Sequence, residues 1–295
     1  MINLTHYDLD GVSSSIIISH FIKDIIPVPT VYNYLKKKAS DFIIGQSQGI
    51  ITDLNFNKEL FDLIKKSKHK YLYIDHHKLD LDLSEYDTLT YYIDERYCAT
   101  ANILSYFKQR NKYTDNENIK KLAYYTNDYD TWLLKTEESQ ILNFIFWKVK
   151  FEKFFDMFRN GYNEKYVEEN RKAFRDDYEN ARKYLDECQK DEFEYDGIKC
   201  IMFYASNYQN LITIFYPHYD YYFIISDVHK MSIRTTSGIS LEYPFKDIEK
   251  LEGVETAGCH DFAGGVNLCQ SLSEEEASAK YFRIMDIILQ YTIRF

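Results

Sequence analysis

Histidine and aspartate side chains follow the first apolar run of the chain, where residues 6–11 read HYDLDG. Alternate residues of a strand share one face, so His6, Asp8 and Asp10 can project together before Gly11 allows a turn into the next helix. One imidazole and two converging carboxylates repel one another unless a cation lies between them. The motif therefore favours a metal site, and a turn with helix caps is the alternative.

Two further apolar runs are also followed by aspartate or histidine. Residues 50–53 read IITD, and residues 73–77 read YIDHH. The carboxyl ends of parallel strands line one crevice, which is where ligands bind in open α/β sheets. A single buried acid or imidazole is usually structural, but packing alone does not account for three strand ends of this kind. Carboxylate oxygens mixed with a few imidazoles suit Mn²⁺ or Mg²⁺.

The elements that must position these side chains follow a βαβα order, which predicts an α/β fold with a mostly parallel sheet covered on both faces. Helical patterns lie near 13–24, 57–67, 98–110, 117–126 and 138–158. The expected strands are Met1–Thr5, Val28–Tyr34, Gly49–Leu54 and Tyr71–Ile74.

The second half predicts a smaller α/β unit behind a long connecting helix. Apolar residues recur at helical spacing through the charged segment 163–190, and a helix of about twenty residues is expected from Glu274. Three strands are expected between these helices: Ile198–Tyr204, Tyr221–Ser226 and Met231–Thr235. The predicted domains are a catalytic domain at 1–158, a helical linker at 159–190 and a substrate-binding domain at 191–295.

Composition narrows the class of protein. The 295 residues are 45% hydrophobic and 17% aromatic with only ten Gly and four Pro, which excludes a disordered or collagenous chain. The net charge of −10 disfavours binding to long stretches of phosphate backbone. Five cysteines without CxxC spacing predict reduced thiols. No apolar segment reaches the length of a membrane span and no signal peptide is evident, so a cytoplasmic protein without membrane partners is expected.

At these motifs the sequence resembles the DHH phosphoesterase superfamily, which is named after the triplet seen here as Asp75-His76-His77. The motifs HYDLDG at 6–11 and TDLN at 52–55 stand in the order that this family requires. Residues 129–132, YDTW, are similar to a motif of the oligoribonuclease B branch, the nanoRNases.

A second resemblance lies in the C-terminal part. Residues 258–265, GCHDFAGG, resemble the GGH-x-x-AAG signature of the DHHA1 substrate domain, and residues 232–236 resemble the SxRS-like strand before it. Cys259 replaces the second Gly and Gly264 replaces an alanine, so the loop is expected to sit slightly differently. The resemblance implies that this domain grips a phosphate or nucleotide terminus through Arg234, Gly258 and His260.

The family resemblance also implies two divalent cations, Mn²⁺ first and Mg²⁺ as the alternative, which activate a water molecule for phosphoester hydrolysis. Asp53 would bridge the two ions, and Asp128 is the alternative to Asp130 as a ligand. Asp75 would orient an imidazole, and His77 would donate toward the substrate phosphate. The implied ligands are His6, Asp8 and Asp53 for one ion and Asp10, Asp53, His76 and Asp130 for the other.

The leading functional prediction is a phosphodiesterase that releases mononucleotides from short RNA or DNA oligomers or from small dinucleotides. The second hypothesis is a RecJ-like single-strand exonuclease, which would need a longer basic channel. A hydrolase of 3′-phosphoadenosine 5′-phosphate, cyclic nucleotides or pyrophosphate is the third. A nucleotide-sequestering protein on a decayed scaffold is the non-enzymatic alternative, and the intact motifs argue against it. A homodimer is compatible with all four.

Overall fold

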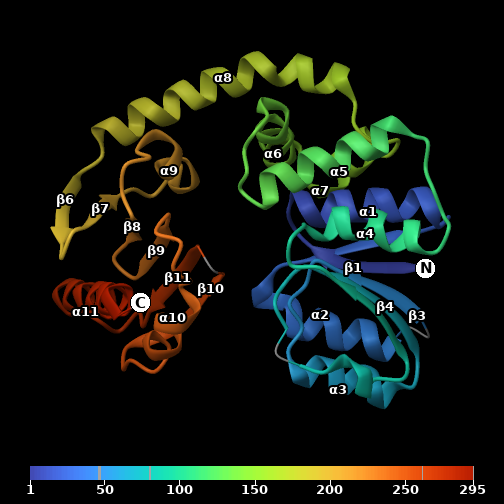
Figure 1. Cartoon of the computed structure of the whole chain (residues 1–295), viewed down its shortest axis with the longest axis horizontal. Helices are drawn as coiled ribbons and strands as arrows, with labels where there is room; N and C mark the ends of the chain where they lie inside the picture. The colour runs from blue at the N-terminus through green and yellow to red at the C-terminus, as the bar shows by residue number, and fades with distance from the viewer. Residues whose placement is uncertain (46–47, 80, 261, 295) are drawn as a thin grey trace. The chain divides into compact units, whose positions relative to one another are not determined.

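The computed structural model describes residues 1–45, 48–79, 81–260 and 262–294, and of His260 only the backbone. The chain divides into two compact units, Met1–Phe174 and Arg175–Phe295 (Figure 1). The division falls within helix α8 (Glu164–Glu187), in the segment for which a connecting helix is expected. In the described parts of the chain, every helix is too short or too polar to cross a membrane.

The first unit contains a five-stranded, entirely parallel sheet with strand order β2-β1-β3-β4-β5. Thr5 of β1 lies opposite Thr52 of β3, which lies opposite Ile74 of β4. Because these three positions are level, the residues that follow them emerge at one edge of the sheet. The strands are β1 (Ile2–His6), β2 (Ile26–Thr30), β3 (Gln48–Thr52), β4 (Lys70–Asp75) and β5 (Leu89–Ile93).

Helices cover both faces of this sheet, which confirms the predicted α/β class (Figure 1). Neighbouring residues of β3 point to opposite faces: Ile50 joins the core under α1, α4, α5, α6 and α7, and Ile51 joins the core under α2 and α3. The helices are α1 (Leu9–Phe21), α2 (Tyr32–Gly45), α3 (Lys58–Ser67), α4 (Ala99–Gln109), α5 (Glu117–Asp130), α6 (Glu137–Val149) and α7 (Phe151–Phe158).

Several expected elements differ from the structure. The helix expected near 13–24 is α1, which already begins at Leu9, and the helix expected at 117–126 is α5, which continues to Asp130. The strand predicted at Val28–Tyr34 is wrong in its second half, because β2 ends at Thr30 and α2 begins at Tyr32. Helix α2 buries Leu35, Ala39, Phe42 and Ile43, a helical spacing that outweighs the strand preference of the tyrosines. The single helix predicted at 138–158 is two helices, because Lys150 between them has a left-handed φ of 69°.

The second unit is built on a six-stranded sheet with strand order β10-β11-β9-β8-β7-β6. Strands β7 and β8 are parallel, and the other neighbouring pairs are antiparallel. Helices α10 (Glu242–Ile248) and α11 (Glu274–Arg294) pack on one face, and α9 (Ile212–Phe215) contributes to the core on the other. The strands are β6 (Lys190–Tyr195), β7 (Ile198–Tyr204), β8 (Tyr221–Asp227), β9 (Lys230–Thr235), β10 (Val254–His260) and β11 (Ala263–Leu268).

Candidate metal centre

The carboxyl edge of the parallel sheet gathers acids and imidazoles from separate parts of the chain. Strands β1, β3 and β4 supply residues directly from their ends, and Asp130 is the last residue of α5. The side chains form three overlapping groups whose potential ligand atoms lie within 4.8 Å of one another. These groups are His6, Asp8 and Asp53; Asp10, His76 and Asp130; and Asp53, Asp75, His76 and His77.

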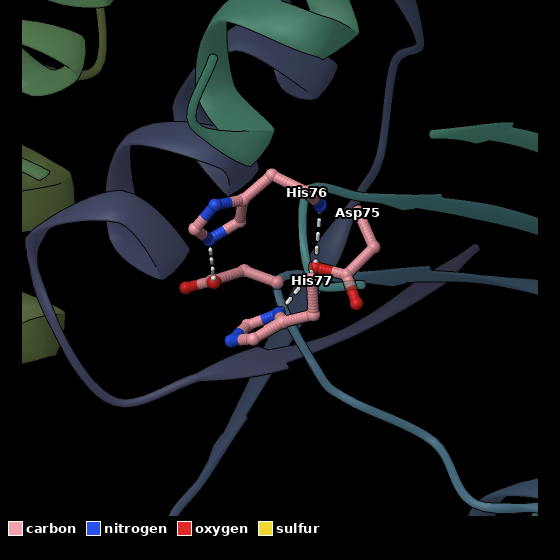
Figure 2. A group of neighbouring side chains, drawn as sticks. Asp75, His76 and His77 are labelled. Carbon is pink, nitrogen blue, oxygen red and sulfur yellow. Dashed lines mark hydrogen bonds and ion pairs between the residues drawn. The ribbon is translucent and has the colours of Figure 1, made fainter. Parts of the chain in front are cut away.

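His76 lies at the centre of the carboxylates. Its Nε2 atom is 3.4 Å from Asp53 Oδ1, 3.7 Å from Asp130 Oδ2 and 3.9 Å from Asp10 Oδ2. Figure 2 shows the ring of His76 directed away from Asp75, which faces His77 instead. Burial opposes protonation of His76, but the charges of Asp130 and Asp10 outweigh it and raise the pKa of this imidazole. One ring nitrogen therefore lies among three carboxylates from three segments.

Asp53 has the features expected of a ligand shared by two ions. It is 2% exposed, and its Oδ2 atom has no hydrogen-bond partner among the described residues. Burial first, and then the charges of Asp8 and Asp10, raise its pKa well above the usual range. Its backbone has a left-handed φ of 54°, a conformation that is uncommon for residues other than glycine. A buried carboxylate oxygen without a partner fits a cation, because leaving it unpaired is costly.

His6 and Asp8 are in direct contact with each other. Nδ1 of His6 lies 2.6 Å from Asp8 Oδ2, and Oδ1 of Asp8 accepts a hydrogen bond from the Gly11 backbone N–H at 2.8 Å. Asp8 is therefore also the N-cap of α1. Burial opposes both charges, but mutual pairing outweighs it, so the pKa of His6 is raised and that of Asp8 is lowered. The cap predicted as the alternative for the HYDLDG motif is present. The prediction that Asp8 and Asp10 project from the strand is wrong, because β1 ends at His6 and Asp10 and Gly11 lie in the first turn of α1.

Asp10 is held in place by the start of α4. The backbone N–H groups of Ala99 and Thr100 donate to its two carboxylate oxygens at 2.8 and 2.9 Å, and the Thr100 hydroxyl donates to its carbonyl at 2.9 Å. A helix N-terminus stabilises a negative charge, so α4 fixes a buried carboxylate facing His76. The hydrogen bonds from the start of α4 to Asp10 were not predicted from the sequence, which indicates only that a helix starts near 98.

The structure separates the roles of Asp128 and Asp130. Asp128 accepts hydrogen bonds from the backbone N–H groups of Lys135 and Thr136 at 3.0 and 3.1 Å and from the Thr136 hydroxyl at 3.0 Å. Asp130 instead lies with Asp10 and His76. Burial first, and then the charge of Asp10, raises the pKa of Asp130 to about 8. Asp128 thus holds the α5–α6 turn, and Asp130 lies with the acids and imidazoles of the candidate metal centre.

Asp75 is turned toward His77. Its Oδ1 atom accepts hydrogen bonds from His77 Nδ1 and from the His76 backbone N–H, both at 2.8 Å, and its Oδ2 atom accepts one from the Tyr73 hydroxyl at 2.6 Å. Burial opposes the charge of Asp75, but His77 outweighs it and lowers the pKa of Asp75. The other nitrogen of His77, Nε2, lies 3.2 Å from the hydroxyl of Tyr32, a residue that sequence reasoning missed.

The residues expected to bind substrate lie in the second unit, on strands β9 and β10, which are separated by β11. Half-buried Arg234 of β9 pairs in register with Ala263 of β11, which pairs with His260 of β10. Gly258 is opposite Gly265. The His260 side chain lies outside the described part of the structure. The backbone register thus aligns the positions of Arg234 and His260 across one intervening strand.

The departure from the expected alanine at Gly264 has a steric reason. A Cβ atom at this position would lie 2.3 Å from the ring of Phe245 and 2.9 Å from Cβ of Cys259. Real Cβ contacts are never this short, so an alanine would require Phe245 to move within the core of the second unit. Gly264 is therefore matched to the large ring packed behind it.

Comparison with known proteins agrees with this geometry. Residues 2–126 match the model of the DHH family, N-terminal domain. No curated protein matches the chain. Among solved structures, the pGpG-specific phosphodiesterase PggH from Vibrio cholerae is similar over 97% of this chain and 99% of its own, with 12% identity and a TM-score of 0.57.

Two RecJ structures are also similar over the whole of this chain. RecJ from Thermus thermophilus in complex with Mn²⁺ has 12% identity and a TM-score of 0.58, and this chain covers 52% of it. An exonuclease RecJ bound to manganese has 14% identity and a TM-score of 0.53, with 90% of that chain covered. At these identities the likeness shows a shared fold.

The family match contains the five strands of the parallel sheet and the motifs HYDLDG, TDLN and DHH. The first unit therefore contains a segment that matches the DHH family, N-terminal domain, with a cluster of acids and imidazoles that could hold metal at the carboxyl edge of its sheet.

Proposed function

We propose that this protein is a phosphodiesterase that uses two divalent cations, preferably Mn²⁺, to hydrolyse short oligonucleotides or small dinucleotides to mononucleotides. The observation that carries the proposal is a pair of potential ligand groups, one containing Asp53 and the other containing His76, whose side chains lie 3.4 Å apart. One group contains His6, Asp8 and Asp53, and the other contains Asp10, His76 and Asp130.

The donor set supports divalent cations. Carboxylate oxygens with a minority of imidazoles suit Mn²⁺ and Mg²⁺. The Oδ2 atom of Asp53, which has no hydrogen-bond partner among the described residues, could bind such a cation. When bound, such cations polarise a phosphoryl oxygen and activate water. We assign His6, Asp8 and Asp53 to the first ion. The second ion is assigned Asp10, Asp53, His76 and Asp130.

The protein's own contribution is to hold these ligands in place before substrate arrives. Asp10 is fixed by the N-terminus of α4 and Asp8 by the start of α1. A centre that is preorganised in this way needs little rearrangement during the reaction. Asp75 fixes the ring of His77 through Nδ1, and we assign His77 to the end of the centre where the substrate phosphate binds.

We assign substrate capture to the second unit as a DHHA1 domain. Arg234, with its guanidinium fork, and His260 would bind a phosphate or nucleotide terminus, and Gly258 leaves space beside the backbone. A Cβ atom built at Gly258 meets nothing within 4 Å among the described atoms, so a ligand has room to approach this strand.

The proposed preference for short substrates is based on charge. The chain carries 46 acidic and 36 basic side chains, and long polymers are retained mainly through many phosphate contacts to Lys and Arg. PggH, which is similar in fold and in length, is named as a pGpG-specific phosphodiesterase. Dinucleotides such as pGpG therefore belong among the substrates to be tested.

The experiment is hydrolysis of a labelled ladder from dinucleotides to 30-mers, in RNA and DNA, with Mn²⁺ or with excess EDTA. The same assay would include pGpG, cyclic dinucleotides and 3′-phosphoadenosine 5′-phosphate. We expect turnover to be fastest at about two to five nucleotides and to stop in EDTA. A strong rise in rate on 30-mers would favour a RecJ-like exonuclease, and full hydrolysis in EDTA would contradict the metal mechanism. Stoichiometric ligand retention without turnover would instead favour a sequestering protein.

A further inference from the structure

Tyr32 connects two motifs of the metal centre, although it belongs to neither. It is the first residue of α2 and follows β2, the edge strand beside β1. Its ring lies against the imidazole of His6, with 4.9 Å between ring centroids and 45° between the planes. Its hydroxyl lies 3.2 Å from Nε2 of His77. One side chain thus touches a predicted metal ligand from β1 and the last residue of the DHH triplet after β4.

The hydroxyl contact involves the nitrogen of His77 that Asp75 does not use. Asp75 is a buried carboxylate that accepts a hydrogen bond from His77 Nδ1–H, and the Tyr32 hydroxyl lies at hydrogen-bond distance from the other ring nitrogen, Nε2. His77 is only 8% exposed and is therefore held from both sides, by Asp75 at one nitrogen and by Tyr32 at the other. Asp75 and Tyr32 together restrict the orientation of the His77 ring.

The ring contact acts on a different residue. His6 uses Nδ1 to pair with Asp8, and the Tyr32 ring packs against the imidazole plane. Contacts that restrict a ligating imidazole influence metal affinity, because a freely rotating ring must be ordered when the ion binds. Tyr32 itself is 47% exposed, so it is not a core residue whose main contribution is burial.

We propose that Tyr32 is a positioning residue of this centre, which orients His6 through its aromatic ring and His77 through its hydroxyl. The ring therefore contributes to the affinity for the metal ion, and the hydroxyl contributes to turnover of the phosphodiester. The second half rests on the proposed function, and the first half does not, because metal affinity is measured without substrate.

The experiment compares Tyr32→Phe, Tyr32→Leu and Tyr32→Ala, with Tyr34→Phe and Tyr34→Ala as matched controls. Tyr34 lies two residues further along α2 and is 62% exposed. For each variant, calorimetry would give the Mn²⁺ dissociation constant, steady-state kinetics on a dinucleotide would give kcat and KM separately, and thermal unfolding in EDTA would report the fold.

Tyr32→Phe keeps the ring, so we expect its Mn²⁺ affinity to stay within about twofold of wild type while kcat/KM falls roughly two- to tenfold. Tyr32→Ala removes both contacts and should weaken Mn²⁺ binding about ten- to a hundredfold, with Tyr32→Leu between the two. Wild-type Mn²⁺ affinity in Tyr32→Ala would overturn the assignment of the ring. Wild-type kcat/KM in Tyr32→Phe would overturn the role assigned to the hydroxyl. If no protein, including wild type, were active, this result would count against the proposed function alone.

Discussion

Nε2 of His76 lies 3.4 Å from Oδ1 of Asp53, although the two residues follow different strands. The parallel register of β3 and β4 makes this possible, because Thr52 and Ile74 are level at the ends of the two strands. Asp53 follows Thr52 directly and has a left-handed backbone, with a φ of 54°. The close approach of Asp53 and His76 is thus a consequence of strand register.

Asp53→Asn should abolish metal-dependent activity, with a loss of more than about a hundredfold, because an amide cannot replace a shared anionic ligand. Asparagine tolerates the left-handed conformation, so the backbone should be kept. The pKa of Asp53 is raised, so its charge is unfavourable in the metal-free fold, and the metal-free variant should unfold at the same or a higher temperature than wild type. Wild-type Mn²⁺ content and rate in the purified variant would show that Asp53 is not the shared ligand.

Metal affinity should rise with pH. The pKa of Asp130 is raised to about 8, against about 3.8 for an ordinary aspartate, so the native metal-free protein holds a proton that the unfolded chain releases between these values. The contribution of this carboxyl to stability is therefore present at low pH and is lost as the pH rises from about 4 to about 8. Divalent ions need the deprotonated ligand, so the Mn²⁺ dissociation constant should fall about tenfold or more between pH 6.5 and 8.5. A dissociation constant that is independent of pH in this range would contradict the buried, protonated state of Asp130.

Replacing Asp128 should reduce the stability of the protein, whereas replacing Asp130 should reduce its affinity for Mn²⁺. Asp128→Ala should lower the free energy of unfolding by about 2 to 4 kcal/mol, since it leaves the backbone N–H groups of Lys135 and Thr136 without their acceptor. Its Mn²⁺ affinity should stay close to that of wild type. Asp130→Asn should weaken Mn²⁺ binding with little loss of stability. Chemical denaturation and calorimetry on both variants test this, and reversed results would exchange the two roles.

Arg234→Ala should weaken substrate capture and leave the metal centre assembled. Losing charge-assisted hydrogen bonds costs about 1.5 to 3 kcal/mol, which corresponds to roughly ten- to a hundredfold in kcat/KM on a dinucleotide. A small ester such as bis(p-nitrophenyl) phosphate should be hydrolysed almost normally by the same variant. If both substrates lost the same factor, Arg234 would instead support the fold of the second unit.

Four of the five strands of the parallel sheet and the motifs that follow them are evident from the sequence because both signals are local, whereas β5 (Leu89–Ile93) was not predicted. An apolar run followed by Asp or His marks a strand end, and level strand ends bring such residues together. The support for Asp10 from α4 and the contact of Tyr32 with His77 join residues about 90 and 45 positions apart, and no local pattern reports such contacts. In the sequence, Asp130 is favoured over Asp128 only by the YDTW resemblance, and the different partners of these two residues depend on where α5 ends and how the chain turns into α6.

Anomalous diffraction at the manganese edge, from crystals equilibrated with Mn²⁺, would show directly which residues bind the ions. We expect two ions about 3.5 to 4 Å apart, with Asp53 in contact with both. His6 and Asp8 should complete the first site, and Asp10, His76 and Asp130 the second. A single ion, or two ions of which neither is bound by Asp53, would contradict this expectation.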